Sequence, residues 1–224
     1  MLLKTDKITK SYKDNKSNKL LIFENLDFSL QDEKIVAIYG PSGVGKTTFL
    51  NLLGTVDTPE SGKIFINDLK YQKKHFQEIR KKYIGYMFQF HYLLPEFTIF
   101  ENLDMTLQIK GIGLNNKIKN RDKILDLLTS FNIEDKIDSY PTQLSGGERQ
   151  RASLARAIIH NPLIVLADEP TGNLDSKNSE KIIDEIKKIS CEKNIKFIIA
   201  THNKSFKRIA DSIYTIRNYS LTKN

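Results

Sequence analysis

The stretch Gly-Pro-Ser-Gly-Val-Gly-Lys-Thr at residues 40–47 constrains this chain more than any other feature. It follows a short apolar run, Lys34–Tyr39, and precedes a segment, Thr47–Leu53, that we expect to be helical and to end at Gly54. Glycines allow a tight turn in which several backbone N–H groups point at one anion, and the dipole of the following helix favours negative charge. The pattern therefore predicts a phosphate-binding loop between a buried strand and a helix.

We expect this loop, Gly40–Thr48, to bind ATP with Mg²⁺ for hydrolysis. Lys46 is expected to contact the β- and γ-phosphates, and the Thr47 hydroxyl to ligate Mg²⁺. The competing interpretation is a flexible glycine-rich turn, which the full match to the pattern disfavours. The candidate binding residues are Gly40, Pro41, Ser42, Gly43, Val44, Gly45, Lys46, Thr47 and Thr48.

A second apolar run, Leu163–Ala167, is continuous, as expected of a strand covered on both faces. It leads directly into Asp168 and Glu169. A carboxylate at the tip of a neighbouring strand can hold the hydration shell of Mg²⁺, which is the role predicted for Asp168. Glu169 is predicted to polarise the attacking water. Alternatively, the two acids could supply negative charge at a helix start, but the loop Thr171-Gly-Asn disfavours an immediate helix.

The remaining chain alternates between predicted strands and predicted helices, which indicates a parallel sheet with a helical insertion in the middle. The further strands are expected at Leu20–Leu30, Lys63–Ile66 and Lys196–Ala200, and the further helices at Ile99–Ile109, Lys117–Phe131, Gly146–Ile159 and Asn178–Ser190.

The segment Leu144-Ser-Gly-Gly-Glu-Arg-Gln-Arg also places small residues before a predicted helix. Exposed N–H groups and the Ser145 hydroxyl would make a second anion site there. An ordinary helix start with a capping box, Ser145 to Glu148, is the alternative. Two such sites around one γ-phosphate make sense if two chains meet head to tail and each supplies one half.

These motifs resemble, in order, those of the ATP-binding cassette (ABC) ATPases, and the resemblance covers nearly the whole chain. It implies that Tyr12 stacks on adenine and that Gln89 contacts Mg²⁺ and senses the membrane subunit. It also implies that Asn173–Asp175 forms the D-loop and that His202 contacts the γ-phosphate. The signature motif would then contribute Ser145, Gly146 and Gly147 to nucleotide binding, and catalysis would involve Glu169, His202, Lys46 and Gln89.

The family resemblance implies an α/β fold: a P-loop NTPase (RecA-like) core with a parallel sheet, an N-terminal antiparallel β subdomain and an inserted helical signature subdomain. We expect one domain over residues 1–224, with the core in 1–90 and 160–224 and the helical subdomain in 91–159. Two copies would sandwich two ATP molecules, and transmembrane permease subunits would dock near Gln89.

The stretch Met87–Asn102 resembles the ATPases of lipoprotein-releasing transporters. We expect its apolar side chains to line a groove for a short helix of the membrane subunit, although a local core is the alternative. Macrolide-efflux and cell-division ATPases have similar sequences and remain the alternative function. A DNA-repair ATPase would need long coiled coils between phosphate loop and signature, and residues 49–143 show no sustained heptads. The groove side chains are Phe90, Tyr92, Leu93, Leu94 and Phe97.

The net charge of +8 arises from scattered basic residues without the aromatic interleaving that stacks bases. We therefore expect a solvated surface and no nucleic-acid partner. No apolar run approaches bilayer length, so we expect the chain to stay in the cytosol. The family resemblance implies a peripheral position on the cytoplasmic face of the inner membrane through its partners. Two departures from the family pattern stand out: Asn203 follows the switch histidine where Asp is usual, and Asn218-Tyr219 replaces a terminal Asp-Gly turn.

Overall fold

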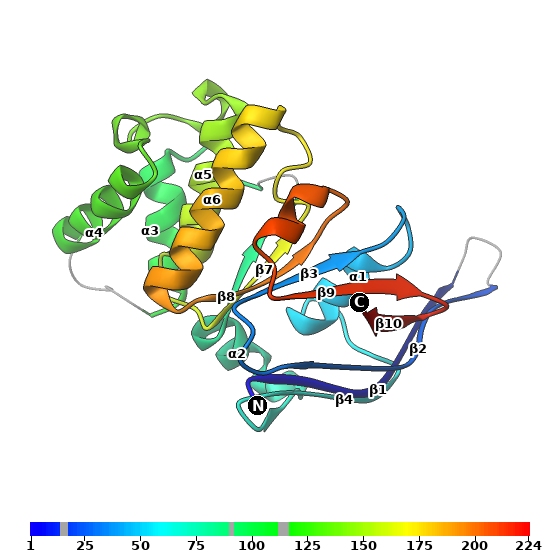
Figure 1. Cartoon of the computed structure of the whole chain (residues 1–224). Coiled ribbons are helices and arrows are strands. Elements are labelled where there is room, and N and C mark those ends of the chain that lie inside the picture. The colour runs from blue at the N-terminus through cyan, green and yellow to red at the C-terminus, as the bar shows by residue number, and fades with distance from the viewer. Residues whose placement is uncertain (14–17, 90–91, 112–116) are drawn as a thin grey trace.

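A six-stranded sheet forms the centre of the computed structural model, which describes residues 1–13, 18–89, 92–111 and 117–224 (Figure 1). Its strand order is β10-β9-β3-β8-β7-β6, and all neighbours are parallel except the β9–β10 pair. The strands are β3 (Ile35–Tyr39), β6 (Ile84–Met87), β7 (Ile164–Asp168), β8 (Lys196–Ala200), β9 (Ser212–Arg217) and β10 (Ser220–Lys223). The predicted parallel α/β core is confirmed.

A separate antiparallel sheet with the order β2-β1-β4-β5 lies across the first helix from the parallel sheet (Figure 1). Its strands are β1 (Leu3–Lys13), β2 (Lys19–Leu30), β4 (Ser61–Ile66) and β5 (Leu69–Lys70). Helix α1 (Lys46–Leu53) packs its buried Phe49, Leu50 and Leu53 into one core with both sheets. The antiparallel part of the expected fold class is thus present.

The remaining α-helices are α2 (Phe76–Lys82), α3 (Ile99–Ile109), α4 (Lys117–Ser130), α5 (Gly146–Ile158) and α6 (Ser176–Lys193). Short 3₁₀ turns occupy Lys73–His75, Glu134–Lys136, Pro141–Gln143 and Lys204–Arg208. Helices α3, α4, α5 and α6 gather on the side of the parallel sheet that faces away from α1 (Figure 1).

Two hydrophobic cores result from the strict alternation of side chains along the parallel strands. In β3, Ile35 and Ala37 point to the core shared with α3–α6, whereas Val36 and Ile38 point to the core shared with α1. Because both faces are covered, the strand is apolar throughout, which explains why it reads as a continuous run rather than an alternating one.

Element boundaries differ from the predictions where local capping was not considered. Helix α6 begins two residues before the predicted start, because the Asp175 side chain caps it by accepting a hydrogen bond from the Asn178 N–H. At its other end the helix is capped by Asn194, which adopts a left-handed conformation. Strands β1 and β6 were not predicted. In β6, Gly85 lacks a side chain because a Cβ there would lie 2.1 Å from the carbonyl oxygen of Ala157.

The C-terminal hairpin survives the replacement of the usual Asp-Gly turn. Asn218 and Tyr219 have φ values of 47° and 62°, so both residues adopt the left-handed conformation that a type I′ hairpin turn requires. Arg217 and Ser220 pair across the turn, and the Glu24 N–H donates to the Tyr219 carbonyl.

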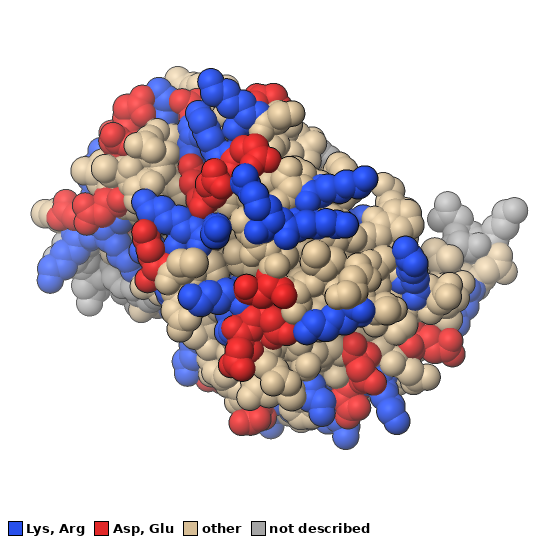
Figure 2. Space-filling view, viewed as in Figure 1, with Lys and Arg blue, Asp and Glu red and all other residues tan. Residues whose placement is uncertain are grey.

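On the face shown in Figure 2, lysine and arginine side chains are interspersed with acidic ones.

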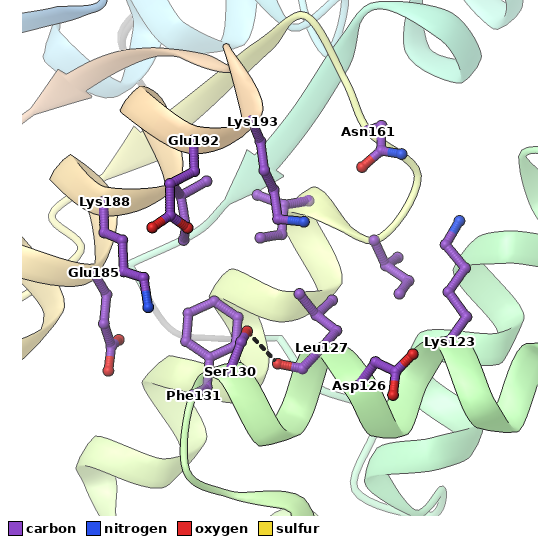
Figure 3. A pocket seen from close by; sticks show the side chains of 13 residues that line it. Lys123, Asp126, Leu127, Ser130, Phe131, Asn161, Glu185, Lys188, Glu192 and Lys193 are labelled. Atoms are coloured by element: carbon purple, nitrogen blue, oxygen red, sulfur yellow. Dashed lines mark hydrogen bonds between the residues drawn. The ribbon is translucent and has the colours of Figure 1, made fainter.

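A cleft of about 300 Å³ lies between α4, the end of α5 and α6 (Figure 3). Lys123 and Asp126 reach it from α4, and Glu185, Lys188 and Glu192 from α6. Among the described residues, no helix is long and apolar enough to cross a membrane.

Candidate active site

The phosphate loop connects β3 to α1 with two glycines in left-handed conformations. Gly43 has φ 78° and Gly45, which caps α1, has φ 109°. A Cβ at Gly45 would also approach Ile22 and Phe23 within 3 Å, so both the backbone angle and the packing require glycine. The buried Lys46 ammonium donates to the carbonyl oxygens of Gly40 at 2.9 Å and Pro41 at 3.1 Å.

Asp168 ends β7 beside the Thr47 hydroxyl. It is 5% exposed, and burial raises its pKa, while Thr47 and Lys46 act in the opposite direction. Its Oδ1 atom is buried and has no hydrogen-bond partner among the described residues. A buried carboxylate oxygen without a partner next to a hydroxyl is a suitable ligand pair for a hard divalent cation.

Glu169 follows in a left-handed conformation, with φ 45°. Non-glycine residues rarely adopt it, and such strain is typical of functional sites. Its backbone N–H donates to the Ala200 carbonyl, so the strain is maintained by the neighbouring strand β8. The carboxylate is 4.0 Å from the Lys46 ammonium, and the residue is 8% exposed.

The segment after β8 holds both oxygens of the Glu169 carboxylate. Oε2 accepts from the Thr201 hydroxyl at 3.2 Å and from the His202 N–H at 3.3 Å. Oε1 lies 3.0 Å from Nδ1 of His202, whose side chain is 71% exposed. The exposed His202 imidazole can contact a bound ligand, and its contact with the buried Glu169 carboxylate also orients that carboxylate.

A cavity of about 380 Å³ brings these elements together. Ten of the predicted site residues line this cavity: Ser42, Gly43, Gly45, Lys46, Thr47, Thr48, Gln89, Asp168, Glu169 and His202. Gly40, Pro41 and Val44 do not line it but shape the loop: a Cβ on Gly40 would collide with Val44, and Gly40 and Pro41 orient Lys46. Residues far apart in sequence thus converge where the parallel strands end.

Tyr12 does not line this cavity. Its ring is 39% exposed, lies 4.8 Å from the Lys10 ammonium, and its hydroxyl donates to Asp57 at 2.7 Å. Burial of the hydroxyl raises the pKa of Tyr12, with the Asp57 carboxylate adding to the rise and Thr48 opposing it. A hydrogen bond with the Thr48 side chain brings the Tyr12 hydroxyl to the end of the phosphate loop, and the exposed aromatic face can stack on a base.

Ser145, Gly146 and Gly147 also lie outside the cavity. Ser145 and Glu148 form the full capping box at the start of α5: Glu148 accepts from the Ser145 N–H and hydroxyl, and Ser145 accepts from the Glu148 N–H. The capping alternative is therefore realised, and it leaves Ser145 exposed at a helix N-terminus. A Cβ on Gly147 would lie 3.1 Å from Asn178.

Gln89 links the cavity to an apolar groove. A passage of about 470 Å³ lined by Thr47, Gln89 and Asp168 continues to Phe88 and Tyr92. From there a groove of about 370 Å³ extends, with Tyr92 and Leu94 in its wall as predicted.

Two expected groove residues are corrected here. Leu93 is 8% exposed and belongs to the core with α3 and α5, and Phe97 is not among the lining residues. Phe90 lies outside the described residues. The buried Asn102 causes this arrangement, because its amide binds the carbonyls of Leu94, Phe97 and Thr98 and fixes the loop that turns Leu94 outward and Leu93 inward.

The sequence did not point to Thr201 as a site residue. Thr201 is completely buried, and its hydroxyl accepts from the Asn203 N–H while it donates to Glu169. A polar residue at the end of a fully apolar strand, directly before a candidate site residue, is the signal that could have found it. Asn203 itself donates to Thr171 at 3.1 Å and caps the following 3₁₀ turn.

A phosphate loop after a buried parallel strand, with paired acids on a neighbouring strand, defines a P-loop nucleoside triphosphatase. Comparisons with known proteins narrow this class. The ABC transporter family model matches residues 23–172. The dimeric structure of the bacterial ABC transporter cassette MJ0796 shares 33% identity and a TM-score of 0.90, covering 99% of this chain and 98% of that one. The same values of identity and TM-score hold for a post-hydrolysis structure of that cassette bound to ADP and Pi.

Curated relatives are similar in sequence to this chain over nearly their full lengths. The lipoprotein-releasing system ATP-binding protein LolD 2 of Chlorobium chlorochromatii is 38% identical, over 97% of this chain and 92% of its own. LolD of Legionella pneumophila (strain Lens) is 37% identical, over 99% and 97% respectively. The chain therefore belongs to the ABC transporter family, and it is an ATP-binding subunit that hydrolyses ATP.

Proposed function

We propose that this ATPase subunit powers the release of lipoproteins from the inner membrane toward the outer membrane. The observation that carries the proposal is the similarity, across nearly whole chains, to proteins named as ATP-binding subunits of lipoprotein-releasing systems. The groove beside Gln89 supports it further, since it offers an apolar surface to a membrane partner at the edge of the nucleotide cavity.

Within the proposed site, the loop Gly40–Thr48 holds the phosphates and Tyr12 stacks on the base. Lys46 neutralises charge on the β- and γ-phosphates. Glu169 takes the role of general base, which is supported by its distance of 3.0 Å from the His202 imidazole and by its burial. His202, held by that carboxylate, presents its accessible ring to the γ-phosphate, and Gln89 positions the water.

Mg²⁺ would be held by Thr47 and Asp168, with Gln89 at the edge of the same cavity. The partnerless Oδ1 of Asp168 supports this assignment. Among the described residues, no cluster of three or more His, Cys, Asp or Glu could hold a metal ion. That suits Mg²⁺, which commonly uses one or two protein ligands together with substrate phosphates. When bound, the ion polarises the phosphates and offsets their charge.

The active unit in this proposal is a pair of chains. Ser145 is exposed, Gly146 half-buried and Gly147 buried at the N-terminus of α5, and none of the three reaches the cavity of their own chain. In a head-to-tail pair they would meet the γ-phosphate bound by the partner. The dimeric state of the MJ0796 cassette supports this arrangement.

The same proposal places the chain on the cytoplasmic face of the inner membrane through permease subunits docked at the Gln89 groove, without a nucleic-acid partner. It assigns residues 1–90 and 160–224 to the nucleotide-binding core and 91–159 to the helical subdomain. The concentration of α3, α4 and α5 in the latter segment supports that division.

The decisive experiment reconstitutes the chain with the membrane subunits that co-purify with it, in vesicles loaded with a radiolabelled lipoprotein. We expect ATP to release lipoprotein to a soluble acceptor, and the matched Glu169→Gln complex to release none. If ATP is hydrolysed while lipoprotein stays in the membrane, the proposed cargo is wrong, and the macrolide-efflux and cell-division alternatives become the ones to test.

A further inference from the structure

Polar groups hold the ring of Tyr12 at its edge and on one face. Its hydroxyl donates to Oδ2 of Asp57 at 2.7 Å and also forms a hydrogen bond with the Thr48 side chain. Lys10, two residues earlier on β1, places its ammonium over the ring, 4.8 Å from the centroid. The part of Tyr12 that stays exposed, 39%, is available to a base.

Asp57 is the centre of this arrangement, because both of its carboxylate oxygens accept hydrogen bonds. Oδ1 accepts from the Lys10 ammonium at 2.7 Å and from the Thr58 N–H at 2.6 Å, while Oδ2 accepts from Tyr12. Burial acts to raise the pKa of Asp57, but the hydrogen bonds from Lys10 and Tyr12 outweigh it, and the pKa is lowered. The carboxylate is therefore ionised at neutral pH, and a charged acceptor binds a phenol more strongly than a neutral one does.

The Lys10 side chain is itself fixed in place. The residue is 8% exposed, and its ammonium donates to the Thr58 carbonyl at 3.0 Å in addition to Asp57. A buried lysine needs such partners, because the loss of hydration disfavours its charge. An ammonium that is held over an aromatic ring attracts the electrons of that ring and keeps the ring face against it. The Tyr12 ring therefore has little freedom to turn.

Helix α1 connects Asp57 to the phosphate loop. The helix starts at Lys46, and the backbone N–H of Asp57 donates to the carbonyl of Asn51 within it at 3.1 Å. The same helix carries Thr48, whose side chain forms the hydrogen bond with Tyr12. These contacts fix the Tyr12 ring relative to the loop that would hold the phosphates, although the ring belongs to a strand of the antiparallel sheet.

We infer that Asp57 and Lys10 are positioning residues for base binding, which together hold the Tyr12 ring in the orientation that stacks on the base. The inference rests on the proposed function for the stacking itself, and it adds the residues that prepare the ring. A ring that is already ordered loses less conformational freedom on binding, so more of the stacking energy appears as affinity. Because the chain itself engages both Asp57 oxygens, base recognition rests on stacking, which accepts adenine and guanine alike.

The test compares two probes without a γ-phosphate: ADP, and inorganic pyrophosphate, which also lacks the base. Calorimetry with the full chain gives the dissociation constant of each. Asp57→Ala, Lys10→Met and Tyr12→Phe should each weaken ADP binding about 3- to 10-fold, the size expected for ordering one side chain, and leave pyrophosphate binding unchanged. GDP should lose as much as ADP. The double variant Asp57→Ala/Tyr12→Phe should lose no more than Asp57→Ala alone, because the two changes remove one shared hydrogen bond.

Glu60→Ala is the matched control. Glu60 lies three residues after Asp57 and accepts from the Ser11 N–H at 3.1 Å, so it anchors the residue next to Tyr12 but not the ring. This variant should bind both probes like the wild type. If it weakens ADP binding as much as Asp57→Ala does, the effect comes from strand β1 as a whole and the inference is overturned. Melting temperatures identify any variant that fails to fold, and Tyr12→Phe, which removes a single oxygen, keeps the test decisive if Asp57→Ala does.

Tyr12→Ala separates the inference from the proposed function. It should weaken ADP binding about 10-fold or more, the size expected for the loss of one stacked base, without affecting pyrophosphate. If it does so while Asp57→Ala and Tyr12→Phe bind ADP like the wild type, the ring stacks without the help of Asp57, and the inference is overturned while the stacking stands. If Tyr12→Ala binds ADP normally, Tyr12 does not hold the base and both fall. Equal losses for ADP and pyrophosphate in Asp57→Ala would also overturn the inference, because the effect would then not act through the base.

Discussion

Glu185 lies on α6 at the edge of the cleft between α4 and α6 (Figure 3). Its Oε2 atom is buried and has no hydrogen-bond partner among the described residues. Burial raises the pKa of Glu185 to about 7, although the charges of Arg151 and Lys181 act in the opposite direction. Folding therefore favours the protonated carboxyl group.

The unfolded chain should lose this proton near the ordinary glutamate pKa of 4.5. Between that pH and about 7 the folded state binds more protons than the unfolded state, so the free energy of unfolding decreases as pH rises. The full interval corresponds to ~3 kcal/mol, at ~1.4 kcal/mol per tenfold change in proton affinity. Water reaches part of the side chain, so we expect about 1–2 kcal/mol.

The variant Glu185→Gln removes the titration. Urea unfolding at pH 8 should show the variant to be more stable than the wild type by about 1–2 kcal/mol, and at pH 5 this advantage should shrink to less than half. Glu192→Gln, at an exposed position on the same helix, is the matched control and should leave the free energy of unfolding nearly unchanged. Equal effects of Glu185→Gln at both pH values would refute the reasoning, since an unperturbed carboxylate would behave in that way.

Three further predictions concern the nucleotide cavity. Glu169→Gln should retain ATP binding and lower turnover by roughly 10²–10⁴-fold because it removes the general base; phosphate release measures the loss and gel filtration with ATP should show a trapped dimer. Lys46→Ala should weaken ATP binding, measured by calorimetry, since the ammonium is the principal charge of the loop. Thr201→Val should lower kcat about 10-fold with little change in KM, and Thr201→Ser should restore it, because valine lacks the hydroxyl that donates to Glu169 and accepts from the Asn203 N–H.

Each of these predictions has a clear contrary result. Near-normal turnover by Glu169→Gln would assign the base elsewhere, and unchanged ATP affinity of Lys46→Ala would remove the lysine from phosphate binding. Equal losses in Thr201→Val and Thr201→Ser would mean that Thr201 acts through packing alone and does not orient the carboxylate.

The sequence predicted the elements whose signals are local. The helix at Ile99–Ile109 has the predicted bounds, because its capping box lies in adjacent residues. The strand at Lys196–Ala200 was likewise predicted with its bounds, since a buried parallel strand is apolar on both faces. The phosphate loop and the paired acids were recognisable because each consists of consecutive residues, so the motif can be read without knowledge of the fold.

What the sequence could not supply depends on contacts between distant segments. Leu93 and Leu94 are identical in type, and the one that is buried depends on the packing around Leu93 and on the hydrogen bonds of the Asn102 amide to the Leu94 backbone. Strand β6 contains a glycine and only four residues, so its place beside β7 rests on the close approach of Gly85 to Ala157. The role of Thr201 depends on the strand register that brings it to Glu169.

Helix α5 connects two surfaces of the proposed function: the signature glycines, proposed to meet the nucleotide of a second chain, and the groove proposed for the membrane partner. Its N-terminus carries Gly146 and Gly147, while Arg156 and Ala157 near its C-terminus line the groove. Thirteen helical residues span ~20 Å, and a hydrogen-bonded helix transmits displacement along its axis with little compression. Because Gly85 leaves no room for even a methyl group against Ala157, the groove end of α5 is fixed to the core sheet. In the proposed docking, a partner that shifts this end of α5 would also shift β6 and the nearby Gln89, which would connect docking to the nucleotide cavity and the signature glycines.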